Sequence, residues 1–302
     1  MLFVLQTALV QGFLYALVPL ALFLSFRILD VADLTTDGCF VLGAAVSVVA
    51  TLAGHPFLGI PLAMLAGAGA GIVTAFLQTK CGVPSILAGI ITNTGLYTIN
   101  LMVMGWASNV SILKSDTIFS LLMNTGIGGQ YYELIIAGGV VIVTAALVVL
   151  FLGTRLGLMV RATGDNMDMV KASSINPTFT ICVGLALSNA MTALSGALVG
   201  QNQNTVDINS GTGIVVIGLA CLIIGETVVG RRGVLRGVIA AIVGSIVYRF
   251  IYALVLYTKV VPVQGLKLLT AIVVALAIAA PTIKNAFEFQ KKKMSGMRKG
   301  DK

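Results

Sequence analysis

RATGDNMDMVKASSIN, residues 161–176, is one of the few polar stretches in this chain, and the apolar stretch PTFTICVGLALSNAMTALSGALVG, residues 177–200, follows it directly. The polar stretch carries charges but no His, no Cys and no nucleophile–base pair. Of the 302 residues, 58% are hydrophobic and only 10% are charged, whereas a soluble protein carries about 25% charged residues. This composition predicts a polytopic helical membrane protein in which residues 161–176 connect two membrane-length segments.

Apolar runs of about the length that crosses a bilayer recur along the chain, since a span needs roughly 17–25 residues. We predict an all-α fold with about nine transmembrane helices, of which the second and seventh are short enough to be discontinuous. The membrane domain is expected to cover residues 1–283, and a basic tail, 284–302, follows it. The predicted helices lie near residues 3–26, 38–53, 60–78, 85–105, 132–152, 178–200, 213–229, 236–257 and 267–283.

The distribution of Lys and Arg predicts how the chain is oriented. Fifteen of the 19 basic residues lie in the alternate connectors and in the tail, and three, Lys114, Lys259 and Lys267, lie in the opposite connectors. Cytoplasmic connectors carry the excess of basic residues, so the C-terminus is expected inside and the N-terminus outside. The basic tail is expected to anchor this topology and to contact anionic membrane lipids. The positions of the basic residues favour membrane orientation over nucleic-acid binding.

Nothing in the sequence builds an enzyme active site. The four cysteines are scattered without a C-x-x-C pair, which excludes the usual metal and redox motifs. The glycine-rich stretch GETVVGRRGVLRG, residues 225–237, lacks the Lys-Ser/Thr end of a P-loop. We therefore expect a non-enzyme with no bound metal or cofactor.

Three carboxylates lie between the first two predicted helices, in RILDVADLTTDG, residues 27–38. Asp30, Asp33 and Asp37 could form an ion or proton site, which is a role of intramembrane carboxylates. Alternatively, the segment is a cytoplasmic turn in which Thr36 and Asp37 cap the following helix. We favour the helix cap.

Polar side chains mark candidates for a translocation pathway. Asn93, Tyr97 and Asn100 are spaced i, i+4, i+7 and therefore share one face of the fourth predicted helix. In lipid, such amides either line a wet path or bond a neighbouring helix. Asn189, in the sixth predicted helix, is a further pathway candidate.

Other features have two interpretations each. Small residues along the sixth helix, among them Ser188 and Ser195, favour close helix packing. The polar loop 201–213 either contacts a delivered solute or docking protein, or is an ordinary solvated loop. Arg249 lies within an apolar run, where it is either functional or extends to the outer interface.

Residues 161–198 resemble the signature of the permease subunits of ABC importers for branched-chain amino acids and ribose-like sugars. The usual run is R-A-x-G-x-N-x-x-A-A-x-x-x-G-I-N, followed by a helix ending S-G-x-L-A-G. DVADLTTDGCFVLGAAV (30–46) and residues 223–247 are also similar to this family, although Glu226 and Arg231 stand in place of glycines and Ser174 replaces the glycine before Ile-Asn. The matching residues are Arg161, Ala162, Gly164, Asn166, Ala172, Ile175, Asn176, Ser195, Gly196 and Ala197.

The resemblance implies a homodimer in a bacterial cytoplasmic membrane, with separate ATP-binding cassette ATPase subunits and an extracytoplasmic substrate-binding protein. LAGIITNTGLYTINLMVMG (87–105) and ADLTTDG (32–38) look most like the permeases for aromatic amino acids. The solute is then expected to be an amino acid, with a nucleoside or a sugar as alternatives. A stand-alone secondary transporter is the rival class, and it would need mid-membrane carboxylates or broken helices. The acids near helix ends argue against it.

The resemblance also implies that the connector 153–177 is a coupling helix that binds a groove of the partner ATPase. Its residue types suit that role, because such a helix needs a charged face and capping residues at its ends. Thr163, Asp165 and Asn166 are expected to start it, and Asn176 to separate it from the next span. The residues expected to couple are Arg161, Thr163, Gly164, Asp165, Asn166, Asp168, Lys171 and Asn176.

Overall fold

The computed structural model describes residues 2–113, 115–124, 129–230 and 233–258, together with Ile272 and Ala275. This part of the chain is mostly helical, as predicted. The elements are α1 (Leu2–Leu22), the π-helix η1 (Phe23–Ile28), α2 (Thr36–Leu52), α3 (Pro56–Thr79), α4 (Ser85–Val103), β1 (Asn109–Ser111), α5 (Ile118–Asn124), the 3-10 helix η2 (Gly129–Tyr131), α6 (Tyr132–Gly153), α7 (Arg155–Asp165), α8 (Met167–Ala172), α9 (Pro177–Gln203), β2 (Thr205–Asp207), α10 (Ile214–Val229) and α11 (Val234–Thr258).

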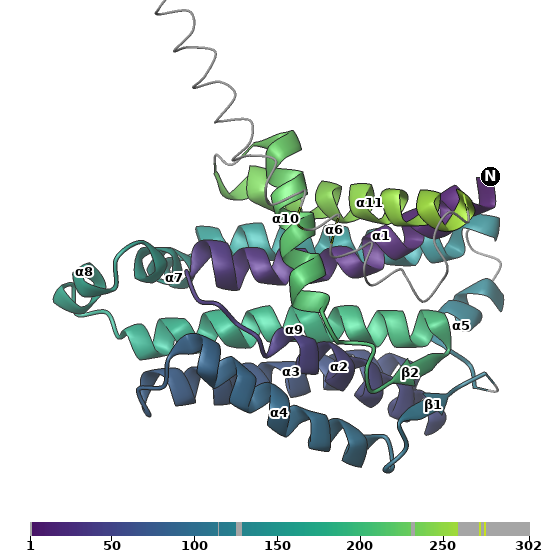
Figure 1. The fold of residues 1–302 in the computed structure, drawn as a ribbon, viewed down its shortest axis with the longest axis horizontal. Helices are drawn as coiled ribbons and strands as arrows, with labels where there is room; N and C mark the ends of the chain where they lie inside the picture. Colours follow the sequence, from purple (N-terminus) through teal and green to yellow (C-terminus); the bar gives the residue numbers. More distant parts are fainter. Residues whose placement is uncertain are drawn as a thin grey trace, which may run out of the picture.

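Six apolar segments are long enough to cross a bilayer, and they contain α1, α3, α4, α6, α9 and α11. The axes of these helices lie roughly along the longest axis of the molecule (Figure 1). Two of the predicted spans, α2 and α10, are shorter apolar helices of 17 and 16 residues. The ninth predicted helix, 267–283, lies outside the described residues apart from Ile272 and Ala275, as does the whole basic tail. The described residues therefore supply six long spans and, in α2 and α10, two shorter apolar helices.

Helix α9 lies at the centre of the helical bundle, against α1, α2 and α3 (Figure 1). Its small residues allow this contact: a Cβ added at Gly196 would collide with the carbonyl oxygen of Phe40 in α2. Ser188 and Ser195 donate hydrogen bonds to the carbonyls of Ala21 and Leu14 in α1, at 2.9 and 2.7 Å. The predicted packing role of these two serines is confirmed.

The segment between η1 and α2, residues 29–35, does not form the predicted cytoplasmic turn. It runs inside the protein, where Asp33 is only 3% exposed and Thr35 is fully buried. The Asp33 carboxylate accepts a hydrogen bond of 2.6 Å from Asn189, which lies near the middle of α9. Helix α2 consequently begins at mid-depth of α9, which explains why it is short.

The predicted capping of α2 by Thr36 and Asp37 is wrong. Asp37 instead accepts hydrogen bonds from the backbone N–H groups of Gly213 and Val215, at 3.0 and 2.8 Å, and so caps α10. The Thr36 hydroxyl donates to the Asp33 carbonyl at 3.3 Å. A carboxylate at a helix N-terminus is stabilised by the unpaired N–H groups and the helix dipole. The starts of the two short helices are thereby joined.

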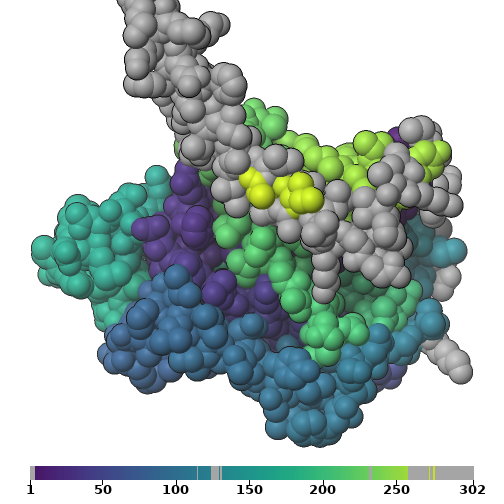
Figure 2. All heavy atoms as spheres, viewed as in Figure 1, coloured from purple at the N-terminus to yellow at the C-terminus, as the bar shows by residue number. Residues whose placement is uncertain are grey.

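The two ends of the molecule differ. Helices α7 and α8 extend beyond the long helices at one end, whereas β1, β2 and α5 lie at the other (Figure 1). The space-filling view shows α7 and α8 as a projection (Figure 2). The strands, which were not predicted, pair antiparallel with Val110 opposite Val206. They join two loops that are far apart in the sequence, so no local pattern indicates them.

Close packing at α9 leads to a stability prediction. Gly196→Ala should destabilise the protein by about 1–3 kcal/mol, because the new methyl group has no room beside the Phe40 carbonyl. Gly139→Ala in α6 is the matched control, since a Cβ there meets no atom within 4 Å, and helix propensity alone favours Ala by up to about 1 kcal/mol. Thermal unfolding in detergent measures the stability of the two variants. If Gly196→Ala melts at the same temperature as Gly139→Ala, the close packing at Gly196 does not contribute to stability as described.

Candidate translocation pathway and coupling surface

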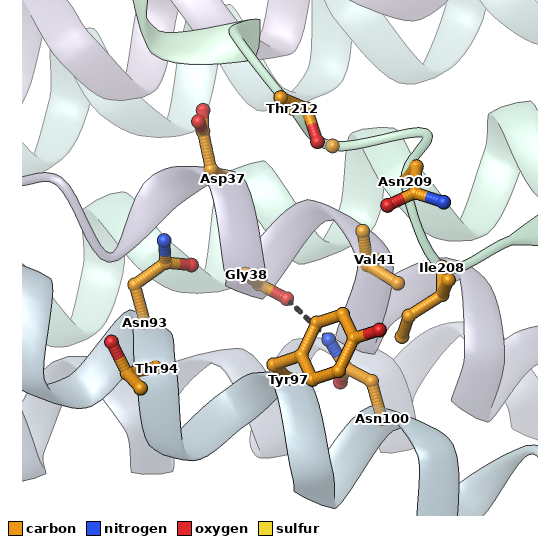
Figure 3. Close-up of a pocket in the computed structure, with 11 residues that line it drawn as sticks. Asp37, Gly38, Val41, Asn93, Thr94, Tyr97, Asn100, Ile208, Asn209 and Thr212 are labelled. Atoms are coloured by element: carbon orange, nitrogen blue, oxygen red, sulfur yellow. Dashed lines mark hydrogen bonds between the residues drawn. The ribbon is translucent and has the colours of Figure 1, made fainter. Parts of the chain in front are cut away.

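A polar pocket of about 340 Å³ lies where α2 begins (Figure 3). Three elements line it: the N-terminal turns of α2, one face of α4, and the loop before α10. The lining residues are Asp37, Gly38, Val41, Asn93, Thr94, Tyr97, Asn100, Ile208, Asn209, Gly211 and Thr212. The pocket therefore lies at the N-terminal end of α2, which begins at mid-depth of α9.

Helix α4 contributes three predicted pathway residues to this pocket, and they share one face as their spacing indicated. Asn100 donates a hydrogen bond of 3.1 Å to the Gly38 carbonyl (Figure 3), while its own side-chain oxygen has no partner among the described residues. The Asn100 amide therefore bonds a neighbouring helix, which is one of the two roles expected for it from the sequence. Tyr97 is 50% exposed, and Asn93 is half-buried near the middle of α4.

The pocket wall has one carboxylate and no basic side chain among its lining residues. Asp37 lies across the pocket from α4 (Figure 3). Its carboxylate accepts hydrogen bonds from the backbone at the start of α10. Asn209 and Thr212 complete this side. The wall thus presents a carboxylate, amides and hydroxyls to any solute inside.

The structure does not place Asn189 in this pocket. Its side chain is fully buried, and its amide donates both to Asp33 and to the Leu185 carbonyl of its own helix, at 2.6 and 3.0 Å. The Asp33 carboxylate also accepts from the Thr35 N–H at 2.9 Å. In this structure Asn189 holds the 29–35 segment against α9.

Hydroxyl groups continue this network towards the pocket. The hydroxyl oxygens of Thr35 and Thr74 are 2.8 Å apart, and Thr74 in turn donates to the Thr92 hydroxyl at 3.0 Å. Thr92 directly precedes Asn93 in α4. Buried hydrogen bonds therefore join α9, the 29–35 segment, α3 and α4.

The connector 153–177 forms two short helices, α7 and α8, at the projecting end. Asn166 caps α8 by accepting from the N–H groups of Asp168 and Met169, both at 3.0 Å. Asn176 caps α9 by accepting from the Thr178 N–H at 3.0 Å. Both capping roles agree with the sequence prediction.

The other predicted coupling residues have different surroundings. Thr163 does not start a helix: it lies inside α7, is 3% exposed, and its hydroxyl is 2.8 Å from that of Thr180 in α9. A Cβ at Gly164 would collide with the Ile28 carbonyl, so α7 packs directly on η1. Asp168 and Lys171 are exposed and paired with each other at 3.3 Å.

Arg161 and Asp165 line a cavity of about 200 Å³ beside η1 and the start of α11. The Arg27 guanidinium lines it too and forms an ion pair of 3.1 Å with Glu226 of α10. In the family motif that residues 223–247 resemble, a glycine stands at the position of Glu226. The ion pair links η1, which precedes the 29–35 segment, to the C-terminal end of α10.

Sequence reasoning missed several of these residues. Asp37 was expected to cap its own helix, and Asn209 and Thr212 were placed in a loop of undecided role. The exposed methionines of α8, Met167 and Met169, were also missed, although they lie beside the predicted charges. The polar character of residues 201–213 was the available signal for the loop; no local signal connects it with α4.

Helices of bilayer length around a polar pocket, with a polar helical connector projecting at one end, define a membrane protein of the transporter class. The family model for the permease component of branched-chain amino acid transport systems matches residues 4–284. The chain belongs to this family. It is therefore a non-catalytic membrane subunit of an ABC transporter.

Individual relatives agree with the family. The tyrosine transport system permease protein of Clostridioides difficile (strain R20291) is 33% identical over 219 residues, which are 72% of this chain and 71% of that protein. The uncharacterized protein RP368 of Rickettsia prowazekii (strain Madrid E) is 34% identical over 225 residues, or 74% of this chain and 78% of that one.

A solved structure also shares the fold. It is an ABC transporter of proposed metal-chelate type in an inward-facing conformation, with a TM-score of 0.51 and 16% sequence identity. The similarity covers 93% of this chain and 85% of that one. At this identity the likeness concerns the fold alone.

The different surroundings of two asparagines lead to a second prediction. Asn189→Leu should destabilise the protein by about 1.5–3 kcal/mol, because it removes a hydrogen bond to a buried carboxylate. Asn93→Leu, at a half-buried position on the pocket wall, should change stability by no more than about 0.5 kcal/mol. Thermal unfolding of the two variants compares them, and an Asn189→Leu protein as stable as the wild type would refute the structural role of Asn189.

Proposed function

We propose that this chain is the permease of an ABC importer that carries a small polar solute, an amino acid, into the cytoplasm. The observation that carries the proposal is the polar pocket lined by Asn93, Tyr97 and Asn100 beside the start of α2. Polar side chains at mid-depth of a membrane protein are costly unless water, protein or solute satisfies them. A solute path gives these side chains such partners.

The chemistry of the pocket wall suits an amino acid. Asp37 offers a carboxylate for the ammonium group, and the Asn93 amide offers N–H donors for the carboxylate. The half-exposed ring of Tyr97 offers an aromatic surface for an apolar or aromatic side chain. The name of the 33% identical tyrosine permease supports the same solute class.

A nucleoside or a sugar is the alternative solute, and it would use the same amides and hydroxyls, with Asp37 accepting from a ribose hydroxyl. The rival class expected from the sequence, a stand-alone secondary transporter, is ruled out because the chain belongs to the permease family of ABC transporters. The buried Asp33 carboxylate is instead held by the Asn189 amide.

We propose that two copies form the transporter and that the pathway lies between them. The described chain lines the pocket only with α2, α4 and one loop, and α4 carries exposed apolar residues such as Ile91 and Ile99 for a partner surface. Arg155 and Lys171 lie in α7 and α8, and Lys80 directly follows α3, whose C-terminal part packs with α7 and the start of α9. These basic residues support a cytoplasmic location for the α7–α8 end. A substrate-binding protein would then dock at the end with β1 and β2.

The α7–α8 connector is the proposed docking surface for the separate ATPase. Its exposed face combines the charges of Asp165, Asp168 and Lys171 with the exposed methionines Met167 and Met169. Unbranched methionine side chains adapt to a partner groove, and charges give orientation. Arg161 and Asn176 lie at the two ends of this surface.

Replacing the pocket amide should impair transport without unfolding the protein. Asn93→Leu is expected to reduce amino acid uptake into proteoliposomes by about tenfold, because two hydrogen bonds of about 0.5–1.5 kcal/mol each are lost. Thr98→Leu, on another face of α4 and absent from the pocket lining, is the control. Wild-type uptake by a stable Asn93→Leu protein would exclude this residue from the pathway.

Charge reversal on the connector should uncouple transport from ATP hydrolysis. Asp165→Lys, at the exposed end of α7, is expected to abolish the stimulation of the partner ATPase and solute uptake together. Asp116→Lys makes the same change at an exposed position of the opposite end, and in an assay without the substrate-binding protein it should have little effect on ATPase stimulation. If both variants stimulate the ATPase normally, the connector is not the docking surface.

A further inference from the structure

A second groove, of about 600 Å³, lies between α1 and α11. It shares no lining residue with the pocket on α4. The two helices touch closely at Gly12, where Ser245 donates a 2.8 Å hydrogen bond to the Gly12 carbonyl. From there the groove follows both helices towards the start of α1 and the end of α11. Its lining residues are Val4, Thr7, Ala8, Gln11, Tyr15, Gln203, Arg249, Tyr252, Ala253, Leu256 and Tyr257.

Arg249 is the only charged side chain among these lining residues. Its guanidinium carbon lies 3.6 Å from the centroid of the Tyr15 ring and 5.8 Å from that of Tyr252. Stacking on an aromatic ring occupies one face of the guanidinium plane and leaves its N–H groups, which lie in that plane, available for an acceptor. The tyrosines therefore fix the orientation of Arg249 without neutralising its charge.

The charge of Arg249 has no counter-ion in the part of the chain that the structure describes. The two ion pairs there join Arg27 to Glu226 and Lys171 to Asp168. The Arg249 Nε is buried and has no hydrogen-bond partner among the described residues. Buried guanidinium groups normally pair with an acid or with several acceptors. An acceptor from outside the described chain would complete the site.

We propose that Arg249 binds the carboxylate or phosphate group of an amphipathic anion whose apolar part lies along the groove. The planar guanidinium matches both oxyanions, because each accepts two parallel N–H bonds. Ala8, Ala253 and Leu256 provide an apolar wall for the remainder of the ligand, and Tyr252 and Tyr257 add aromatic rings. The two sources of such a group are an anionic lipid and a free arylalkyl carboxylate.

This site is separate from the proposed pathway and does not depend on it. A binding assay in the absence of ATP therefore tests it, whatever the pocket on α4 carries. The full chain, in complex with its ATPase, would be placed in nanodiscs of phosphatidylcholine. Thermal unfolding is then measured with sodium 3-phenylpropionate or neutral 3-phenylpropanol, and separately in nanodiscs that contain phosphatidylglycerol.

The wild-type complex should gain a few degrees in melting temperature from at least one of the two anions and not from the alcohol, because a ligand that binds only the folded state stabilises it. Arg249→Gln should abolish this gain. Ala253→Phe places a large side chain in the groove while retaining Arg249, so it should also abolish the gain in melting temperature. This variant tests the proposal if Arg249→Gln does not fold. Arg236→Gln removes an exposed arginine near the other end of α11, outside the groove, so it is the control and should keep the gain.

The anion that stabilises the complex identifies the source: phosphatidylglycerol alone indicates a lipid site, and 3-phenylpropionate alone indicates a carboxylate solute. Stabilisation by both supports a shared oxyanion site. The proposal is overturned if neither anion raises the melting temperature, or if the rise persists in Arg249→Gln or in Ala253→Phe.

Discussion

The hydrogen bond between the Asp33 carboxylate and the Asn189 amide determines where α2 begins, and the arrangement of the pocket depends on it. Non-helical backbone at membrane depth is tolerated only where protein or a wet cavity satisfies its polar groups. The 29–35 segment meets this condition because Asp33 accepts from both Asn189 and the Thr35 N–H. With α2 starting at mid-depth, Asp37 reaches the first turn of α10, and the two short helices frame the polar space beside α4.

The same contacts give the projecting connector a physical route to the pocket. Gly164 of α7 lies against the Ile28 carbonyl, directly before the 29–35 segment, and Thr163 bonds Thr180 of α9. Helix α9 then carries Asn189. A displacement of α7 by a partner would therefore press on both ends of the Asp33–Asn189 contact. We infer that this contact is the element through which the connector acts on the pocket.

Local patterns in the sequence indicated much of this structure. The apolar runs gave eight of the predicted helices, and the capping residues Asn166 and Asn176 were recognisable because a cap and its N–H partners are two or three residues apart. The spacing of Asn93, Tyr97 and Asn100 correctly placed them on one face, since helical periodicity is a local property.

The features that were missed depend on partners distant in the chain. Asp37 caps a helix whose first residues lie more than 170 positions later, and nothing near Asp37 distinguishes this from capping its own helix. The sequence favours Asn189 as a pathway residue, and no local pattern indicates its hydrogen bond to Asp33, which lies 156 positions earlier in the chain. Thr163 likewise suited a helix start, whereas its hydroxyl faces Thr180 in the core.

An importer permease of the kind proposed here must expose the pocket on α4 to opposite sides of the membrane in turn. A single cysteine at Asn93, in a background with Cys81 replaced by Ser because it is the exposed native thiol, would be labelled in proteoliposomes that contain the ATPase. Cysteines at Ser210 and Ser173 mark the expected outer and inner faces. A membrane-impermeant reagent should reach position 93 from one side without nucleotide and from the other side with ATP and vanadate. Labelling from the same side in both states, with the markers behaving as expected, would contradict this alternating exposure.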